Sequence, residues 1–553
     1  MKIALAQLNY IPGDISYNSN RIISYIDRAR SEGADLIVFS ELAVTGYPPL
    51  DLLLRPDIIS ASMAAVTEIA SHCNGIAAIV GGPSPNTGVY GKSLHNSAFF
   101  LKEGRISAII NKTLLPTYDI FDEDRYFQPG NDFRTVELKG RKIALTICED
   151  IWDEQPFGDK GLWRLYSVSP LDEIMKDNPS VIINIAANPF SHNRIKVREE
   201  VFSRNAKEYG IPLISVNQTG GCTELIFDGS SVLIDADGTV LEKLAFCAED
   251  IRIVELPSPG CDRSKFTCPP PFPEDMTGHI HRALVTGIRD FFAKGGMKRA
   301  ITGLSGGIDS AVVVALAAEA LGPENTLALL MPSAYSSDHS VSDSVKMASA
   351  LGVPYHIVSI EEARQAMEKT LKPFFEGREP DVTEENIQSR LRAVMLMAFA
   401  NKLGYMLLNT SNKSEAATGY GTLYGDMAGG LSVIGDVYKT EVYRLAREIN
   451  SNGEIIPPAI ISKPPSAELK PGQLDTDSLP PYSMLDPILF KYIDLEWPAD
   501  RIIGEGNDPE LVEKIIRLVR TSEFKRKQTP PILRVSSKAF GSGRRMPIIA
   551  RYR

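Results

Sequence analysis

The first half of the chain is built from short apolar runs separated by polar turns. Such runs, rich in apolar and β-branched residues, predict strands, and residues 1–14 alternate in the same way. Helical periodicity is confined to a few stretches, such as 18–31 and 194–209. Many strands and few helices predict sheets that pack on each other and are flanked by helices. The predicted strands are 35–40, 75–82, 97–101, 105–111, 142–148, 180–186, 212–218 and 229–235.

The second half changes to a regular alternation of strands and helices. This order predicts a doubly wound parallel sheet, so the fold class of the whole chain is α/β. The last hundred residues, 450–553, are rich in proline with one clear helix at 508–521, and they are expected to fold over the sheet. The predicted strands are 299–304, 326–332, 354–360 and 405–410, and the predicted helices are 309–321, 338–351, 360–372, 384–403 and 436–449.

A proline-rich stretch divides these two patterns. Residues 257–276 hold six prolines and no apolar periodicity, which is typical of an extended linker. We therefore predict a first domain over 1–256 and a second over 277–553. The total of 553 residues is too long for a single core and agrees with two large domains.

The composition limits the partners, the location and the kinds of metal site that the chain is expected to have. The net charge of −10 argues against a nucleic-acid partner. No run is apolar and long enough to cross a bilayer, so we expect a cytoplasmic protein without a membrane partner. The six cysteines show no CxxC spacing, so neither a zinc site nor a disulfide framework is predicted. After His356 there is no histidine or cysteine, which favours Mg²⁺-dependent phosphate chemistry there over a soft-metal site.

Three polar residues stand at the ends of three apolar runs: Glu41, Lys112 and Cys148. Sheets build sites at the carboxyl ends of their strands, so these side chains are expected to converge. Cys148 would then be a nucleophile, Glu41 its general base, and Lys112 the cation that stabilises the thiolate and the oxyanion. The alternative is an inert buried thiol, because the two acids that follow Cys148 raise its pKa, with Glu41 and Lys112 at the surface.

Three segments around these residues carry a family resemblance. They are FSELAVTGYPPLDLL at 39–53, NKTLLPTYDIFDEDRYFQPG at 111–130 and LTICEDIWD at 145–153. They resemble the catalytic segments of the nitrilase-like carbon–nitrogen hydrolases. More narrowly, they are similar to the glutaminase domain of the glutamine-dependent NAD synthetase family. The resemblance implies an α-β-β-α sandwich for the first domain.

The same resemblance implies roles for individual residues. Cys148 would attack the glutamine carboxamide and release ammonia, and Glu41 would assist the hydrolysis of the thioester. Glu123 resembles a further acid that many members carry near the lysine. Asn188 stands where the family usually has serine, and Arg194 stands where lysine is often found. The residues implied to hold glutamine are Tyr118, Asn188 and Arg194.

The most specific stretch of the chain is RAITGLSGGIDSAVVVALAAEALG at 299–322. A predicted strand leads into paired glycines and a helix, an arrangement that lets backbone N–H groups and the helix dipole bind phosphate. A glycine-rich turn that binds nothing is the alternative. The stretch lacks the Walker lysine and does not fit GxGxxG. It resembles the SGGxDS loop of the ATP pyrophosphatases, which have the adenine-nucleotide α-hydrolase type of fold and adenylate a substrate. The resemblance assigns ATP to Gly303, Leu304, Ser305, Gly306, Gly307, Ile308, Asp309, Ser310 and Thr410.

Phosphate chemistry of this kind calls for Mg²⁺ and hard oxygen ligands. Asp309 and Glu415 are the candidates, although Glu415 could instead be a helix-start acid that only complements the dipole. The segment 407–430 resembles the NAD synthetase motif. This resemblance also gives Glu415 to deamido-NAD, and it places Asp426 and Lys439 nearby. It assigns Asn386 and Lys525 to deamido-NAD as well, with Arg390 near Asn386. The other interpretation of the helix at 384–403 is a core helix on which Arg390 and Arg392 are solvated.

The resemblance covers nearly the whole chain and implies one reaction, the last step of NAD biosynthesis. ATP would adenylate deamido-NAD, and ammonia from glutamine would pass inside the protein to form NAD. Deamido-NAD, L-glutamine and ATP would be the substrates, Mg²⁺ the cofactor, and a homo-oligomer the assembly. Three alternatives stay open: another ATP-pyrophosphatase amidotransferase, a tRNA-modifying enzyme, and a non-catalytic metabolite sensor. The lack of CxxC and the acidic charge weigh against the second, and the intact candidate residues weigh against the third.

Overall fold

The computed structural model describes residues 1–153, 165–257, 260 and 262–550. It divides into two units, each with its own core. The N-terminal unit is Met1–Cys222 with Ile226–Pro273, and the C-terminal unit is Thr223–Leu225 with Glu274–Arg553. None of the described helices is long and apolar enough to cross a membrane.

The N-terminal unit is built on two six-stranded sheets. The first has the order β14 (Asp250–Glu255), β1 (Lys2–Gln7), β2 (Leu36–Val38), β3 (Ala77–Pro85), β4 (Leu94–Lys102) and β5 (Arg105–Asn111). The second has the order β13 (Val240–Lys243), β12 (Val232–Ile234), β9 (Leu213–Asn217), β8 (Val181–Ala186), β7 (Arg141–Ile147) and β6 (Val136–Leu138). The helices are α1 (Ile15–Ser31), α2 (Pro56–Ser71), α3 (Pro170–Met175) and α4 (Ile195–Tyr209), and a two-stranded sheet joins β10 (Thr219–Cys222) to β11 (Leu225–Asp228).

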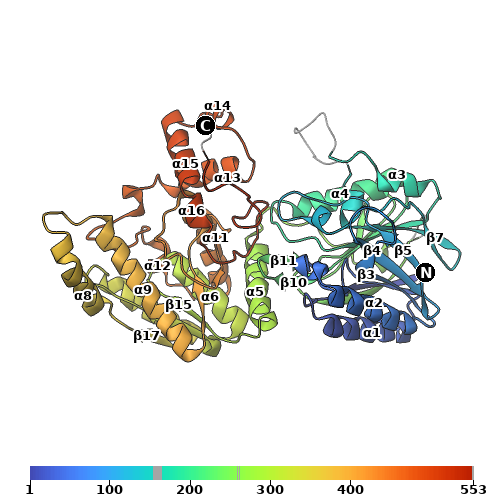
Figure 1. Cartoon of the computed structure of the whole chain (residues 1–553), viewed down its shortest axis with the longest axis horizontal. Helices are drawn as coiled ribbons and strands as arrows, with labels where there is room; N and C mark the ends of the chain where they lie inside the picture. Colours follow the sequence, from blue (N-terminus) through green and yellow to red (C-terminus); the bar gives the residue numbers. More distant parts are fainter. Residues whose placement is uncertain (154–164, 258–259, 261, 551–553) are drawn as a thin grey trace. The chain divides into compact units, whose positions relative to one another are not determined.

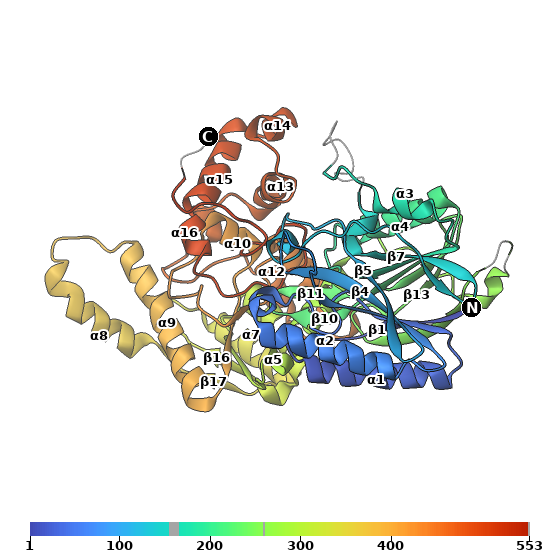
Figure 2. The same cartoon turned by 45° about the vertical axis from the view of Figure 1, so that its right-hand side comes forward.

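The cores show why these elements form four layers. Alternate residues of one strand belong to different cores: Ile3 and Leu5 of β1 pack between the two sheets, whereas Ala4 and Ala6 pack under α1 and α2. A third core lies between the second sheet and α3 with α4. Figures 1 and 2 show α1 with α2 and α3 with α4 on opposite sides of the strands. This is the predicted α-β-β-α sandwich, and β1 is buried on both faces because both sheets lie inside it.

The C-terminal unit contains one five-stranded sheet in which every pairing is parallel. Its order is β17 (Tyr355–Ile357), β16 (Thr326–Leu330), β15 (Ala300–Gly303), β18 (Met406–Asn409) and β19 (Leu431–Ser432). The helices are α5 (Thr277–Lys294), α6 (Ile308–Leu321), α7 (Asp338–Leu351), α8 (Glu361–Leu371), α9 (Val382–Leu403), α10 (Lys413–Thr418), α11 (Lys439–Ile449), α12 (Pro458–Ser462), α13 (Tyr482–Ile493), α14 (Ala499–Gly504), α15 (Pro509–Thr521) and α16 (Glu523–Arg526).

The strand order places a switch point between β15 and β18. The chain leaves β15 in one direction to β16 and β17, and it returns to the other side for β18 and β19. On one face of the sheet, α9 packs its Leu396 and Phe399 against Ile301 and Leu407. In open α/β sheets, ligands bind beyond the carboxyl ends of the strands at such a point.

The tail packs against the edge strand of this sheet and against helices that follow its strands. Ile532 forms a parallel bridge with Ser432 at the edge strand β19, and α13 packs on α10 and α11. In Figures 1 and 2 the helices α13, α14 and α15 gather at one end of this unit. The tail therefore docks beside the carboxyl end of the strands.

The proline-rich stretch at 257–276 is attached to the N-terminal unit. The N–H of Cys268 bonds the carbonyl of Leu241 at 2.9 Å, and the N–H of Thr267 bonds Glu242 at 2.9 Å. Phe266 packs against the core between the sheets. Residues 258, 259 and 261 of this stretch lie outside the described residues.

Candidate active sites

Three strands of the N-terminal unit deliver Glu41, Lys112 and Cys148 to one place. Glu41 follows β2, Lys112 follows β5, and Cys148 follows β7 in the facing sheet. β5 points the same way as β2, because two antiparallel pairings separate β5 from β3, which is parallel to β2. All three side chains are buried. The structure thus brings together the residues that the sequence analysis expected to converge.

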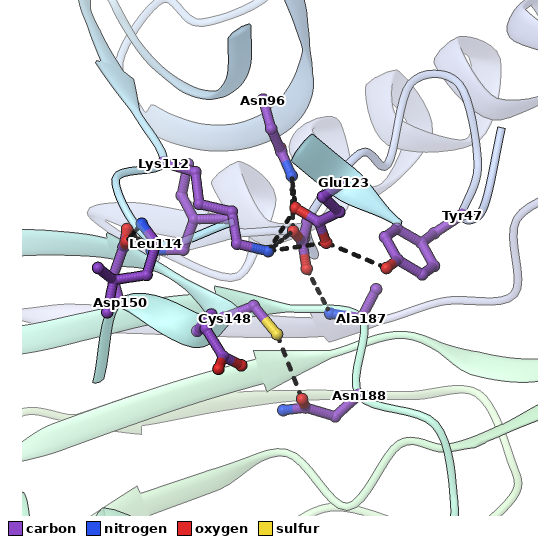
Figure 3. A network of polar contacts seen from close by, with 12 residues as sticks. Tyr47, Asn96, Lys112, Leu114, Glu123, Cys148, Asp150, Ala187 and Asn188 are labelled. Carbon is purple, nitrogen blue, oxygen red and sulfur yellow. Dashed lines mark hydrogen bonds and ion pairs between the residues drawn. The ribbon is translucent and has the colours of Figure 1, made fainter. Parts of the chain in front are cut away.

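Lys112 is the centre of a buried ionic cluster (Figure 3). Its Nζ lies 2.7 Å from Glu41 Oε1 and 2.8 and 2.9 Å from the two oxygens of Glu123. Burial alone would lower the pKa of Lys112, but Glu123 and Glu41 outweigh it and hold that pKa well above its usual range. Burial raises the pKa of Glu123 to about 7. The ammonium is therefore permanently charged and fixed between two carboxyl groups.

Neighbouring donors fix the two carboxyl groups. Asn96 Nδ2 lies 2.7 Å from Glu41 and 3.3 Å from Glu123, so one amide bridges both acids. The backbone N–H of Ala187 donates to Glu41 Oε2 at 3.1 Å, and the Tyr47 hydroxyl lies 3.1 Å from Glu123. Lys112, Asn96 and Ala187, from three different parts of the N-terminal unit, therefore fix the orientation of Glu41.

The Cys148 thiol is neutral in this arrangement. Burial raises its pKa well above the usual range, Glu41 raises it further, and Lys112 opposes them only in part. The thiol donates to Asn188 Oδ1 at 3.2 Å. Cys148 has a φ of 44°, a left-handed conformation that is uncommon for a residue with a side chain and is found at functional sites.

The two acidic residues that follow Cys148, Glu149 and Asp150, are buried. Asp150 accepts the N–H groups of Thr113 and Leu114, both at 2.9 Å, and so ties the chain after Lys112 to the turn after Cys148. Burial raises the pKa of Asp150 to about 6. This carboxyl group therefore holds the segment after Lys112 against the turn that begins at Cys148.

Of the three residues predicted to hold glutamine, Asn188 and Tyr118 have contacts at or next to Cys148, whereas Arg194 is exposed. Asn188 contacts the thiol, and its amide nitrogen is buried without a hydrogen-bond partner in the part of the chain that the structure describes. The Tyr118 hydroxyl lies 2.9 Å from Glu149, the residue after the nucleophile candidate. Arg194, at the start of α4, has an exposed side chain that forms no hydrogen bond or ion pair with the described residues. The buried arginine here is Arg198, which pairs with Asp228 at 2.6 Å.

The second candidate site lies at the switch point of the parallel sheet. A cavity of about 270 Å³ is lined by residues after β15 and after β18, and by tail residues from Lys463 to Leu469. The predicted ATP residues in its wall are Gly303, Leu304, Ser305, Gly307, Ile308, Asp309, Ser310 and Thr410. Gly306 is not in the wall, because it faces the backbone of Ser340 on α7.

The metal candidates Asp309 and Glu415 share this cavity. Lys439 forms an ion pair with Asp309 and lies 3.9 Å from Glu415. Burial, and then the neighbouring Asp309, raise the pKa of Glu415 well above its usual range. No group of three or more His, Cys, Asp or Glu residues poised to hold a metal occurs among the described residues. Two neighbouring, partly buried carboxyl groups nevertheless fit a hard cation, because its charge would relieve the effect of Asp309 on Glu415.

A second, larger cavity of about 1520 Å³ adjoins the first. Both are lined by Tyr420 and Asp426. Asn386, on α9, lines the larger cavity and accepts a hydrogen bond from Thr422 at 2.7 Å. Lys525 also lines it, with its ammonium bonded to the carbonyl oxygens of Gly419 and Gly421 at 2.8 and 2.7 Å. The predicted deamido-NAD residues thus divide between adjoining cavities, with Glu415 in the smaller one.

The two arginines of α9 differ in their surroundings. Arg390 is exposed and bonds the carbonyl of Leu423 at 3.2 Å. Arg392 lines the smaller cavity, where its Nε bonds the carbonyl of Met331 at 3.1 Å and burial lowers its pKa. The interpretation of Arg392 as a solvated surface residue is wrong, because α9 turns this position toward the carboxyl end of the sheet.

Comparisons with known proteins give the family of each half of the chain. Residues 2–156 match the carbon-nitrogen hydrolase family model, and residues 280–529 match the NAD synthase family model. One protein carries both parts along its length: the glutamine-dependent NAD(+) synthetase of Synechocystis sp. is 44% identical over 552 residues, covering 99% of this chain and 98% of that protein. The chain belongs to the glutamine-dependent NAD(+) synthetase family.

Other members of the glutamine-dependent NAD(+) synthetase family match over a similar span. The protein of Xanthomonas campestris is 41% identical over 557 residues, covering 100% of this chain and 98% of that protein. The solved glutamine-dependent NAD+ synthetase of Acinetobacter baumannii, in complex with ADP, gives a TM-score of 0.77 at 36% identity, with 99% and 98% of the two chains covered. That of Cytophaga hutchinsonii shares the fold, with a TM-score of 0.83 at 19% identity and 100% and 98% covered. The predictions of the family and of both fold classes are confirmed.

Several residues of this synthetase-family chain escaped the sequence analysis. Asn96 sits inside the apolar strand β4, where a lone amide gives no sign of its partners. Asn412 caps α10 and donates to Asp309 at 3.0 Å. Its signal was present, because Asn412 and Glu415 have the spacing of a capping box. Glu468 and Asp475 also line the smaller cavity. They belong to the tail, where the sequence has no periodicity that could have indicated them.

The buried Glu149 gives the N-terminal unit a pH-dependent stability. Burial raises the pKa of Glu149 to about 7 from its usual 4.5. A raised acid pKa contributes stability that is complete below 4.5 and is lost as the pH rises through 7. Relative to Glu149→Gln, the wild type is expected to lose up to about 3 kcal/mol of unfolding free energy between pH 5 and pH 8. Urea unfolding at each pH measures this, with the exposed Glu200→Gln as the control. Parallel curves for the wild type and Glu149→Gln would contradict the assignment.

Alanine substitutions at Gly306 and Gly307 form a matched pair that tests the backbone conformation of the loop. Gly306 has a φ of +81°, and a Cβ there would lie 2.7 Å from the Ser340 carbonyl oxygen. Gly307 has a φ of −92°, and its Cβ would meet only the Ser305 hydroxyl at 3.3 Å. We expect Gly306→Ala to lower the unfolding free energy by about 3 kcal/mol and Gly307→Ala by less than about 1 kcal/mol. Thermal unfolding without nucleotide compares them, and equal melting temperatures would contradict the backbone argument.

Proposed function

We propose that the chain converts deamido-NAD to NAD, with ATP as the energy source and glutamine as the nitrogen donor. The observation that carries this proposal is the pairing of two sites in one chain of the glutamine-dependent NAD(+) synthetase family. One is the Glu41–Lys112–Cys148 cluster, and the other is the cavity at the SGGIDS loop. The domain boundary within 257–276 and a cytoplasmic location are proposed from the sequence pattern, and a homo-oligomer from the resemblance.

The glutaminase step begins from a neutral thiol. Glu41 takes the proton of Cys148 as the sulfur attacks the glutamine carboxamide carbon. The Lys112 ammonium faces the developing oxyanion. As the intermediate collapses to a thioester, Glu41 gives the proton to the leaving nitrogen, and ammonia is released. Glu41 then activates water, and hydrolysis yields glutamate and the free thiol. Asn188 and Tyr118 are proposed to hold the substrate, and the exposed Arg194 is proposed to reach it only when glutamine is bound.

The synthetase step uses the two adjoining cavities. The nicotinate carboxylate of deamido-NAD attacks the α-phosphorus of ATP, pyrophosphate leaves, and an acyl adenylate forms. Ammonia attacks the acyl carbon, a proton is lost, and AMP leaves with NAD. Residues 303–310 and Thr410 are proposed to bind ATP, and Asn386, Glu415 and Lys525 to bind deamido-NAD. Lys525 would do so by exchanging its carbonyl contacts for a phosphate.

Mg²⁺ fits the carboxyl groups in the smaller cavity. Asp309 and Glu415 would hold it, and when bound it supplies charge neutralisation for the phosphate chain. Lys439 now neutralises Asp309 and would turn toward the phosphates. Asn412 keeps Asp309 in place through the bond at 3.0 Å.

A product analysis tests the proposal. The purified chain with glutamine, ATP, MgCl₂ and deamido-NAD should yield glutamate, NAD, AMP and pyrophosphate in equal amounts. Omitting deamido-NAD should stop AMP formation. ADP and phosphate in place of AMP and pyrophosphate would overturn the adenylation step. Amidation of another nucleotide in preference to deamido-NAD would overturn the substrate assignment.

A further inference from the structure

A short helix carries the residues that face Asp309 in the smaller cavity. Asn412 is the N-cap of α10, and its amide donates to Asp309 at 3.0 Å. Asn412 and Glu415 also bond each other's backbone N–H at 3.0 and 3.2 Å. A helix of six residues has little stability of its own, so outside contacts must set its position.

The first of these contacts is made by a fully buried lysine. Lys413 Nζ lies 3.0 Å from Asp436, 3.1 Å from both oxygens of Asp494 and 2.8 Å from the Ser536 hydroxyl. Asp494 is the C-cap of α13, and Ser536 lies beyond residue 529, where the match to the NAD synthase model ends. Both partners therefore belong to the tail.

Ser414, the next residue along α10, also bonds a carboxylate of the tail. Ser414 Oγ lies 2.6 Å from Asp486, also on α13. The other oxygen of Asp486 accepts the N–H of Thr440 at 2.9 Å, and Ser414 accepts the N–H of Lys439 at 3.0 Å. One tail carboxylate thus joins the start of α10 to the start of α11, which carries the lysine paired with Asp309.

A purely stabilising role is a poor account of this cluster. Buried ion pairs cost so much desolvation that apolar replacements are often as stable, and their best-attested use is to fix one arrangement. Lys413 and Ser414 are buried on one side of α10, while Glu415 lines the cavity and Asn412 bonds Asp309. The cluster therefore fixes the register of α10 against Asp309.

We propose that Lys413 is a positioning residue of the synthetase site, through which the C-terminal tail sets the place of Glu415 and Asn412. This inference rests on the proposed function for the identity of the ligand, Mg²⁺ with ATP. Residues that orient metal ligands from behind typically change metal affinity 10- to 100-fold. The tail is then part of the ATP site although Lys413 itself touches no substrate.

The test uses a double variant in which the buried Asp436 loses its ion pair with Lys413 but keeps its hydrogen bonds. In Lys413→Met with Asp494→Asn, Asp436 still accepts the N–H groups of Val535 and Ser536 at 2.8 and 2.7 Å. A matched control is Leu284→Ala, which opens a cavity under the buried face of α5. Calorimetric titration of the full chain with ATP, with and without MgCl₂, gives the affinity and its Mg²⁺ dependence. Thermal unfolding checks that the two variants are equally folded.

We expect the double variant to bind ATP in the presence of Mg²⁺ about 10- to 100-fold more weakly than the wild type. The affinity of the double variant for ATP without Mg²⁺ should change little. Leu284→Ala should bind ATP as tightly as the wild type, both with and without Mg²⁺. A folded double variant with the affinity and Mg²⁺ dependence of the wild type overturns the inference. A wild type that binds ATP with Mg²⁺ but forms no NAD overturns the proposed function, and the same titrations still decide the role of Lys413.

Discussion

Cys148→Ala should lose NAD formation from glutamine by on the order of 10⁴-fold while it still forms NAD from ammonium chloride. The alanine removes the only atom proposed to bond the carboxamide carbon, and the cluster of Lys112 with Glu41 and Glu123 stays in place. The synthetase cavity has its own residues and needs only ammonia from outside. Rates with each nitrogen source at saturating ATP measure the split.

The matched control for this variant is Cys247→Ala. Cys247 is also buried in the N-terminal unit but follows a different strand. It should keep both activities. NAD formation from glutamine by Cys148→Ala would remove the thiol from the mechanism. A loss with both nitrogen sources in a folded variant would argue that the two reactions do not have separate sites.

Asp309→Asn should show the opposite split. We expect NAD formation from ammonium to fall by on the order of 10²- to 10³-fold, because the variant loses the charge that would face Mg²⁺ and the closer of the two carboxylates paired with Lys439. Glutamine hydrolysis to glutamate should continue, since the thiol site shares none of these residues. Asparagine has the shape of aspartate, so the hydrogen bond with Asn412 can persist with its amide turned.

Asp500→Asn is the control for the charge change, since Asp500 is exposed on α14. It should behave as the wild type in both assays. Full ammonium-dependent activity in Asp309→Asn would overturn the role of this residue in the ATP site. A Mg²⁺ requirement that shifts to higher concentration, with the maximal rate kept, would assign it to metal binding alone.

The sequence was sufficient to predict site residues that directly follow the ends of strands. Glu41, Lys112 and Cys148 each follow an apolar run, and the run predicts both the strand and where it ends. The loop at 303–310 was found in the same way, because its glycines and the following helix are contiguous. In both cases a local pattern was enough to find the site.

The rest depends on contacts that no local pattern encodes. Asn96 bridges Glu41 and Glu123 from a third strand, and Asp494 reaches Lys413 across 81 positions of the chain. The long helices α2 and α5 were not predicted. α2 lies between loops without a strong boundary signal except Pro56, and α5 follows directly on the proline-rich stretch. Packing decides these elements, and packing is not visible in a single sequence.

The neutral state of Cys148 affects how the protein survives outside a reaction. A thiolate is the form that oxidants and alkylating reagents attack, and a buried thiol bonded to Asn188 offers almost none of it. Cys268, by contrast, is exposed on the proline-rich stretch. A fluorophore or a surface anchor can therefore be attached at Cys268 in the resting protein, while burial protects the sulfur of Cys148, the proposed nucleophile.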